Sequence, residues 1–192
     1  MITAGCDVGS TTAKAVILAD GEITASEVIP ARLDPVESAI EVMDCCLGKA
    51  SLSLKDIDHI VGTGYGQQQI PFVTRCESEV TCHGAAAFFY YPEPCMVIDI
   101  GGQDAKVTKL DQRGKVIQYS YNDKCAAGTG RFLEIMADAL GVALTDMGEV
   151  GRTFKEKLTI SNQCVIFAET EVVHGRLDHP PMRIEQFQQH VI

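Results

Sequence analysis

The chain has 192 residues, a formal net charge of −10 and eight cysteines, and its 46% hydrophobic content is enough for the core of one large domain or two small lobes. The negative charge argues against nucleic acid and anionic membrane surfaces as main partners, and no window has the apolar length of a transmembrane helix. The N-terminus has neither the basic nor the apolar region of a secretion signal. We therefore expect a cytoplasmic protein whose cysteines serve metal or redox chemistry rather than disulfides.

The first thirty residues predict three strands. Their apolar and alternating runs favour strand structure. The Asp20-Gly21 pair is typical of a tight hairpin turn between the second and third strands. The predicted strands cover residues 2–8, 13–20 and 21–30.

A helix is predicted directly after these strands. Asp34 is a suitable N-cap residue, and Pro35 suits the first helical position. Glu37 has the spacing to bond back to the backbone of the cap. Gly48 is typical of a helix end.

The middle of the chain alternates strand and helix patterns. A short strand leads into the glycine-rich stretch TGYGQQQ, and a helical stretch ends before Pro92. The almost fully apolar run CMVIDI is expected to be a central strand of a sheet. Two further strands form a predicted hairpin around residues 111–114. These elements cover residues 59–63, 78–91, 95–100, 105–111 and 115–121.

One pattern occurs twice in the chain. An apolar strand, an aspartate, a glycine, a polar residue and a hairpin follow one another at residues 2–28 and again at residues 96–121. The repeat predicts two related lobes of an α/β protein, with the boundary near residues 92–94. We assign residues 1–92 to the first lobe and residues 93–192 to the second.

The first repeated turn, DVGSTTAK at residues 7–14, has the composition of a phosphate-binding turn. Gly9 lets the backbone approach a phosphate closely, and Lys14 offers a positive charge. Hydroxyl and amide groups come from Ser10, Thr11 and Thr12.

The second repeated turn, DIGGQDAK at residues 99–106, has the same character. Gly101 and Gly102 leave the backbone open to a phosphate, and Gln103 is suited to orient a water molecule. Asp104 and Lys106 complete the predicted binding residues of this turn.

Asp7 and Asp99 each end an apolar strand, where an unpaired carboxylate is costly. A Mg²⁺ ion shared with bound phosphates is a natural partner, so we predict that the two aspartates and Gln103 are catalytic and that phosphates bind between the two turns. Neither turn is a Walker loop. Two ordinary hairpins with polar turns are the alternative, which the repetition disfavours.

Six motifs together carry a resemblance to a known family. They are DVGSTTAK, VGTGYG, ESEVTCHGAAA, DIGGQDAK, NDKCAAGTGRFLE and QCVIFAETEV, in this order from residue 4 to about residue 173. The set resembles the ATP-dependent activators of 2-hydroxyacyl-CoA dehydratases, a family that includes the ATPase subunits of benzoyl-CoA reductase.

The resemblance implies the actin, sugar-kinase and heat-shock-chaperone type of ATPase fold, with two ribonuclease H-like lobes. It implies an ATPase, dependent on Mg²⁺, that passes electrons from reduced ferredoxin or flavodoxin to a dehydratase or reductase. It also implies a homodimer bridged by one [4Fe-4S] cluster, and the ligands carried over to this chain are Cys125 and Cys164.

The sequence around Cys125 supports its role as a cluster ligand more strongly than the sequence around Cys164 supports that of Cys164. A cubane cluster takes four thiolates, so two ligands per chain require two chains. Cys125 precedes a predicted helix, whose amides and dipole we expect to face the cluster. Cys164 alone reads as a core residue, because the VIF run after it has the pattern of a buried strand.

The remaining cysteines are expected to be structural, with Cys76 and Cys95 undecided. Cys45 and Cys46 are adjacent and so point to different sides of a helix. Cys82-His83 is interpreted as packing rather than as a metal site. The stretch HGRLDHPP from residue 174 is interpreted as a solvated loop, with a metal site at His174, Asp178 and His179 as the less favoured alternative.

The chain departs from the family pattern in three places. Gln67 replaces an arginine after TGYG, and Thr170 replaces a serine between two glutamates. After Val173 no glycine-rich adenosine-binding turn follows, so we expect the second lobe to be incomplete at its C-terminal end. Two alternatives to an electron-transferring ATPase therefore remain, a small-molecule kinase of the same superfamily and a truncated, non-catalytic remnant.

Overall fold

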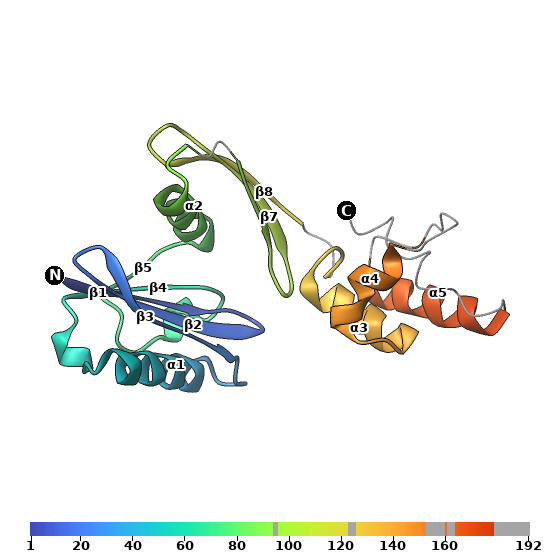
Figure 1. Ribbon diagram of the computed structural model, residues 1–192, viewed down its shortest axis with the longest axis horizontal. Helices are drawn as coiled ribbons and strands as arrows, with labels where there is room; N and C mark the ends of the chain where they lie inside the picture. Colours follow the sequence, from blue (N-terminus) through green and yellow to red (C-terminus); the bar gives the residue numbers. More distant parts are fainter. Residues whose placement is uncertain (94–95, 123–125, 153–159, 161–163, 179–192) are drawn as a thin grey trace. The chain divides into compact units, whose positions relative to one another are not determined.

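A computed structural model describes residues 1–93, 96–122, 126–152, 160 and 164–178 (Figure 1). Its contacts divide the chain into two compact units. The first unit comprises Met1–Val97 and Lys109–Ile117, and the second comprises Ile98–Thr108 and the described residues from Gln118 onward. The lobe boundary expected near residues 92–94 remains a prediction.

The first unit contains a five-stranded sheet in the order β3-β2-β1-β4-β5. The strand β1 pairs antiparallel with β2 and parallel with β4, so it lies at the centre of the sheet. The strands are β1 Ile2–Val8, β2 Thr12–Ala19, β3 Glu22–Pro30, β4 His59–Thr63 and β5 Arg75–Cys76.

The hairpin between β2 and β3 confirms the predicted turn. Asp20 and Gly21 have φ angles of 52° and 90°. Two positive φ angles are what a tight two-residue hairpin requires, and aspartate and glycine are residues that adopt them most readily. The sequence pair therefore determines where the chain reverses.

The helix α1, Pro35–Ala50, covers one face of the first sheet (Figure 1). Its buried residues include Val42, Met43 and Cys46, and they join the inward side chains of β1 and β2 in one core. Alternate positions of β1 are buried in that core, as a half-covered strand requires. The β1 and β2 members are Ala4, Cys6, Val8, Ala13, Ala15 and Ile17.

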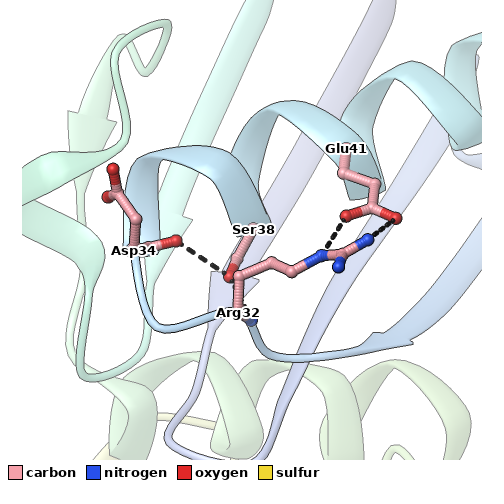
Figure 2. A network of polar contacts seen from close by, with 4 residues as sticks. All are labelled: Arg32, Asp34, Ser38 and Glu41. Carbon is pink, nitrogen blue, oxygen red and sulfur yellow. Dashed lines mark hydrogen bonds and ion pairs between the residues drawn. The ribbon is translucent and has the colours of Figure 1, made fainter.

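The start of α1 follows the predicted capping residues (Figure 2). The Asp34 carboxylate accepts a hydrogen bond from the Val36 amide at 2.8 Å, and Pro35 occupies the first helical position. The return contact expected from Glu37 does not occur at this described helix start. Instead the Ser38 hydroxyl donates to the Asp34 carbonyl at 3.1 Å.

Figure 2 also shows how the chain entering α1 is fixed to the helix. The Arg32 amide donates to the Ser38 hydroxyl at 2.8 Å, and the Arg32 guanidinium forms two hydrogen bonds to Glu41, at 2.7 and 2.8 Å. These bonds lower the pKa of Glu41. The helix ends at Ala50, two residues beyond the predicted Gly48, where Ser51 adopts a left-handed conformation.

The helix α2, Glu79–Tyr90, confirms the predicted helix before Pro92. The Ser78 hydroxyl accepts a hydrogen bond from the Thr81 amide at 3.1 Å, which caps the helix. Gly84 lies on the face of α2 that approaches the β7–β8 hairpin, because a Cβ there would lie 2.9 Å from a Leu110 methyl group. Two short 3-10 helices precede α2, η1 Leu54–Asp56 and η2 Gln67–Gln69.

A second, three-stranded sheet has the order β6-β7-β8, with β6 Met96–Ile100, β7 Ala105–Leu110 and β8 Val116–Tyr121. The expectation that β6 is a central strand is wrong for the described residues, because β6 lies at an edge. Met96, Ile98 and Ile100 are 57%, 69% and 64% exposed. The residues that the structure describes therefore leave the apolar side chains of β6 exposed.

The hairpin between β7 and β8 turns where the sequence predicts. Gly114 has a φ angle of 74°, and the Asp111 carboxylate accepts hydrogen bonds from the amides of Arg113 and Lys115. These backbone hydrogen bonds lower the pKa of Asp111.

The helices of the second unit are α3 Gly130–Leu140, α4 Met147–Gly151 and α5 Val165–Asp178, with the short 3-10 helix η3 Leu144–Asp146 before α4. A second core joins Phe132 and Met136 of α3 to Val165, Ala168 and Val172 of α5. Residues 174–178, expected to lie in a solvated loop, continue α5. In the part of the chain that the structure describes, no helix is long and apolar enough to cross a membrane.

Candidate functional site

The first phosphate turn is closed by a hydrogen bond across it. The Gly9 amide donates to the Thr12 carbonyl at 3.0 Å, and Asp7 lies opposite Lys14 in the β1–β2 register. A Cβ on Gly9 would lie 3.0 Å from the Thr12 oxygen and 3.2 Å from the Lys14 ammonium. A side chain at position 9 would therefore crowd the turn, and Ser10 and Thr11 are exposed at its tip.

The second phosphate turn has the same backbone arrangement. The Gly101 amide donates to the Asp104 carbonyl at 2.9 Å. A Cβ on Gly101 would lie 3.1 Å from the same carbonyl oxygen. The pattern that repeats in the sequence is therefore accompanied by the same closing hydrogen bond in both turns.

Each turn has a lysine that forms an ion pair with an aspartate of the same motif. Lys14 lies 3.0 Å from one carboxylate oxygen of Asp7, on the strand that precedes the turn. Lys106 lies 2.8 Å from Asp104, within the turn itself, and its side chain is only 11% exposed. Lys14 also donates to the Thr12 carbonyl at 3.4 Å, so each lysine contacts a group of its own turn.

The other carboxylate oxygen of Asp7, Oδ1, is buried and has no hydrogen-bond partner among the described residues. Asp7 lies opposite Thr63 in the parallel β1–β4 register, so both residues stand at the carboxyl ends of parallel strands. Ligands of open α/β sheets bind at such ends. A buried, unpaired carboxylate oxygen at this position fits a site for a cation or for a water molecule bound to one.

Gly64, which the sequence analysis did not place in the site, shapes the surroundings of Asp7. It has a φ angle of 90°, and a Cβ there would lie 2.3 Å from Asp7 Oδ1 and 2.5 Å from the Val8 carbonyl oxygen. Any side chain would fill the space beside the unpaired oxygen. The signal in the sequence is the glycine-rich stretch directly after β4, whose role becomes clear only from the β1–β4 pairing.

Asp99, Gln103 and Gly102 belong to the second turn as predicted. Asp99 is partly buried in β6, and Gln103 is exposed. The Gly101 and Gly102 carbonyls accept hydrogen bonds from the first two amides of α3, those of Gly130 and Arg131, at 3.0 and 2.8 Å. The second turn is therefore bonded directly to the start of a helix.

This arrangement corrects the expectation that the α3 amides face a cluster. The helix begins at Gly130, five positions after Cys125, and its first two amides bind the second phosphate turn. Cys125 itself lies outside the described residues. The Thr129 hydroxyl does not cap α3 but donates to the Ala126 carbonyl at 2.6 Å.

Cys164 directly precedes α5, and its carbonyl accepts the Ala168 amide at 3.1 Å. The alternative that the VIF run forms a buried strand is therefore wrong, because these residues form the first turn of a helix. The Cys164 residue is partly exposed. Its position at a helix N-terminus places the positive end of a helix dipole next to the residue.

The other described cysteines differ in burial, and two of them are core residues. Cys6 and Cys46 are buried, and Cys45 is exposed, as expected of neighbours on one helix. Burial raises the pKa of Cys6 to about 12. Among the residues that the structure describes, no group of three or more His, Cys, Asp or Glu side chains is placed to hold a metal ion, and Cys82-His83 forms no such group.

The family model and the most similar relatives found by comparison with known proteins indicate the same family. A family model described as the BadF/BadG/BcrA/BcrD ATPase family matches residues 4–178. The chain is 42% identical over 174 residues to the 2-hydroxyisocaproyl-CoA dehydratase activator of Clostridioides difficile, a match that covers 90% of this chain and 65% of the relative. The chain spans about two thirds of the length of the curated relatives it matches.

Two solved structures resemble the structure over nearly all of this chain. One is the (R)-2-hydroxyglutaryl-CoA dehydratase component A of Acidaminococcus fermentans, with a TM-score of 0.85 and 37% identity, covering 96% of this chain and 71% of that one. The other is the activator of the 2-hydroxyisocaproyl-CoA dehydratase from Clostridium difficile with bound ADPNP, with a TM-score of 0.83 and 40% identity, covering 96% and 69%.

Proposed function

The chain belongs to the BadF/BadG/BcrA/BcrD ATPase family, and from this premise we propose that it is an ATP-hydrolysing activator that delivers a low-potential electron to a 2-hydroxyacyl-CoA dehydratase or a related reductase. Its fold is the expected actin, sugar-kinase and heat-shock-chaperone type. One observation carries the proposal: a phosphate turn, repeated in both sequence and backbone, is hydrogen-bonded to the helix that follows a predicted cluster ligand.

In this proposal both phosphate turns contact Mg-ATP. The small residues and hydroxyls of the first turn, and Gly101 and Gly102 of the second, bind the phosphates through backbone amides and side chains. Lys14 and Lys106 neutralise phosphate charge, and Gln103 orients the attacking water. The relative with bound ADPNP supports nucleotide binding by this fold.

Asp7 and Asp99 are the proposed Mg²⁺-side carboxylates. The best support is the buried Oδ1 atom of Asp7, which has no partner among the described residues and is left open by Gly64. Mg²⁺ prefers oxygen ligands and keeps several of its waters, so contact through a water fits this space. The ion supplies charge that stabilises the transferring phosphoryl group.

Cys125 and Cys164 are the proposed ligands of a [4Fe-4S] cluster shared by two copies of the chain. Such a cluster needs four thiolates, and each copy offers two. When bound, it supplies a one-electron site. Cys164 supports the proposal because it stands at the N-terminus of α5, where the helix dipole favours a negatively charged group.

The proposed use of ATP is to make electron delivery favourable. Raising one electron by roughly 300 mV costs about 7 kcal/mol, since tenfold in equilibrium corresponds to about 59 mV. Thermal fluctuation does not supply this, whereas a nucleotide-driven change of state does. The bonds from Gly130 and Arg131 to the second turn give the change a route, because movement of the turn displaces the start of α3.

The proposed partners follow from the relatives. Named relatives activate a dehydratase, so we propose a dehydratase or reductase as electron acceptor. Reduced ferredoxin or flavodoxin is the proposed donor. The partner binds the ATP state more tightly than the ADP state, because a ligand shifts an equilibrium only by its difference in affinity.

An anaerobic preparation of the protein tests the proposal. We expect about four iron atoms per dimer and ATP hydrolysis that requires Mg²⁺. Phosphate transfer to a small molecule without bound iron would support a kinase of the same superfamily instead. Absence of both iron and hydrolysis would indicate a non-catalytic chain and would contradict the proposal.

A further inference from the structure

Thr63, the last residue of β4, carries a second buried oxygen atom near the first phosphate turn. The residue is 9% exposed, and its Oγ1 atom has no hydrogen-bond partner among the described residues. Asp7 Oδ1 has the same character, and Asp7 lies opposite Thr63 in the parallel β1–β4 register. Opposed residues of neighbouring strands extend their side chains from the same face of the sheet. The two oxygens without partners therefore belong to neighbouring side chains on one face.

Thr63 is buried on the face of the sheet that α1 does not cover. Ile60 belongs to the core under α1, so Thr63, three positions later in the strand, extends from the opposite face. There the Cys82 side chain of α2 lies next to Thr63, without a hydrogen bond to the threonine oxygen. Burial raises the pKa of the Cys82 thiol. The Glu77 amide donates to the Gly62 carbonyl at 2.9 Å and fixes the chain that leads into α2.

The shape of the threonine side chain does not explain why position 63 carries a hydroxyl. Branched side chains suit strands, but valine has the same shape and no polar group to bury. A buried hydroxyl without a hydrogen bond destabilises the fold, because the group loses its bonds to water. The hydroxyl is explained if a further molecule binds to it in the working protein.

The two oxygens restrict the chemistry of that molecule. A carboxylate oxygen only accepts hydrogen bonds, so the molecule must donate one to Asp7 Oδ1, which a phosphate oxygen without a proton cannot do. Lys14 lies 3.0 Å from the other carboxylate oxygen and disfavours direct contact of Asp7 with a bare cation. A water molecule can donate to Asp7 and bond to the Thr63 hydroxyl at the same time. Mg²⁺ keeps several of its waters when it binds to proteins.

We infer that the Thr63 hydroxyl and Asp7 Oδ1 together bind one water molecule of the Mg²⁺ ion that accompanies the nucleotide. This inference rests on the proposed function, and it adds to the site a residue that lies outside both phosphate turns. Thr63 acts through the water and not on the phosphates, so it is a positioning residue. Its effect on nucleotide binding therefore depends on Mg²⁺.

Calorimetric measurement of ADPNP affinity at increasing Mg²⁺ concentration tests the inference. In the unaltered chain we expect Mg²⁺ to tighten ADPNP binding. In Thr63→Val the Mg²⁺ concentration that gives half of this effect should rise about threefold to tenfold, the range that one net hydrogen bond gives, whereas the affinity in EDTA should not change. Thr63→Ser keeps the hydroxyl and should behave like the unaltered chain. Thr24→Val, the same change in β3 of the same sheet, is the matched control and should not alter the Mg²⁺ response.

Thermal unfolding separates this role from a purely structural one. Without nucleotide, Thr63→Val should unfold at the temperature of the unaltered chain or above it, because the change removes a buried hydroxyl that has no partner. With Mg-ADPNP, the rise in unfolding temperature should be smaller in Thr63→Val than in the unaltered chain, because a ligand that binds more weakly stabilises less.

Three results would overturn the inference and leave the proposed function standing. The first is a Thr63→Val variant with the Mg²⁺ response of the unaltered chain. The second is an equal loss of affinity with and without Mg²⁺, which would place the hydroxyl on a phosphate. The third is a lower unfolding temperature of Thr63→Val without nucleotide, or its failure to fold while Thr63→Ser folds, which would make the hydroxyl part of the fold. If the unaltered chain does not bind ADPNP, the proposed function fails and the inference fails with it.

Discussion

The two phosphate turns have the same backbone and different connections. In each, a glycine amide bonds to the carbonyl three residues later, and a Cβ on the glycine would be in tight contact with that carbonyl oxygen. The first turn joins strands that α1 covers, and its lysine pairs with Asp7 on β1. The second turn lies beside the exposed edge strand β6 and gives two carbonyls to α3. The same type of turn thus joins two core strands in the first unit and is hydrogen-bonded to the start of α3 in the second.

The two strands that carry Asp7 and Asp99 also differ in how deeply their apolar side chains are buried. Ala4 and Cys6 precede the first turn and are at most 5% exposed. Met96 and Ile98, at the equivalent positions before the second turn, are more than half exposed. The first turn therefore follows a strand packed in a core, and the second follows a strand whose apolar side chains the described residues leave exposed. A change at the first turn should affect folding as well as chemistry.

The largest expected effect comes from the two aspartates. Asp7→Asn and Asp99→Asn should each lower the rate of ATP hydrolysis by about 10²-fold or more, the size typical for removal of one positioned electrostatic group. Iron content and cluster absorption should not change. Hydrolysis that survives both changes would show that the turns do not form the nucleotide site.

Loss of a cluster ligand should affect the dimer more than the nucleotide site. Cys125→Ser and Cys164→Ser should each lose most of the bound iron and weaken the dimer, since four thiolates are needed. Cys45→Ser, at an exposed position of α1, is the matched control and should keep its iron. Iron assays and sedimentation velocity measure both properties, and a monomer with a full cluster would contradict the shared site.

Two glycines with similar backbone conformations should differ in their tolerance of alanine. Gly64→Ala should lower the free energy of unfolding by more than about 2 kcal/mol, because strain at positive φ adds to a clash with Asp7 Oδ1. Gly128→Ala should cost about 1 kcal/mol, because its surroundings are open. Equal costs in urea unfolding would show that the packing around the first turn is looser than the contacts indicate.

The smallest expected effect concerns the cap of α1, which supports the sheet under the first turn. Asp34→Ala should lower the free energy of unfolding by about 1 kcal/mol, because the Val36 amide loses its acceptor. Asp44→Ala, at an exposed position within the same helix, should not destabilise the protein. Thermal unfolding of the two variants checks the difference, and ATP hydrolysis should be unchanged in both.

Local residue chemistry predicted much of the first unit. The Asp20-Gly21 turn and the Asp34-Pro35 helix start depend on conformations that few residues adopt, so the residues identify them. The repeated glycine turns were predicted for the same reason. The role of Gly64 was not, because it depends on the parallel pairing of β1 and β4, which are separated by about fifty residues.

Features that depend on distant neighbours were missed or wrong. An apolar run such as β6 indicates burial but does not say whether a strand lies on each side. The first turn of α5 was open to a strand interpretation, since a short apolar run has no clear period. The sequence predicted that the α3 amides face the cluster, because Cys125 lies just before the helix. Their actual bonds to the second turn were missed, because they join segments that are far apart in the sequence.

The central claim is that ATP drives electron transfer from this protein to its partner. Stopped-flow mixing of the reduced protein with its dehydratase, with and without Mg-ATP, tests it most directly. A full-length relative should be measured alongside, because this chain spans about two thirds of such proteins. We expect rapid transfer only with Mg-ATP, and its loss in Asp99→Asn. Equal transfer rates with and without ATP would contradict the coupling.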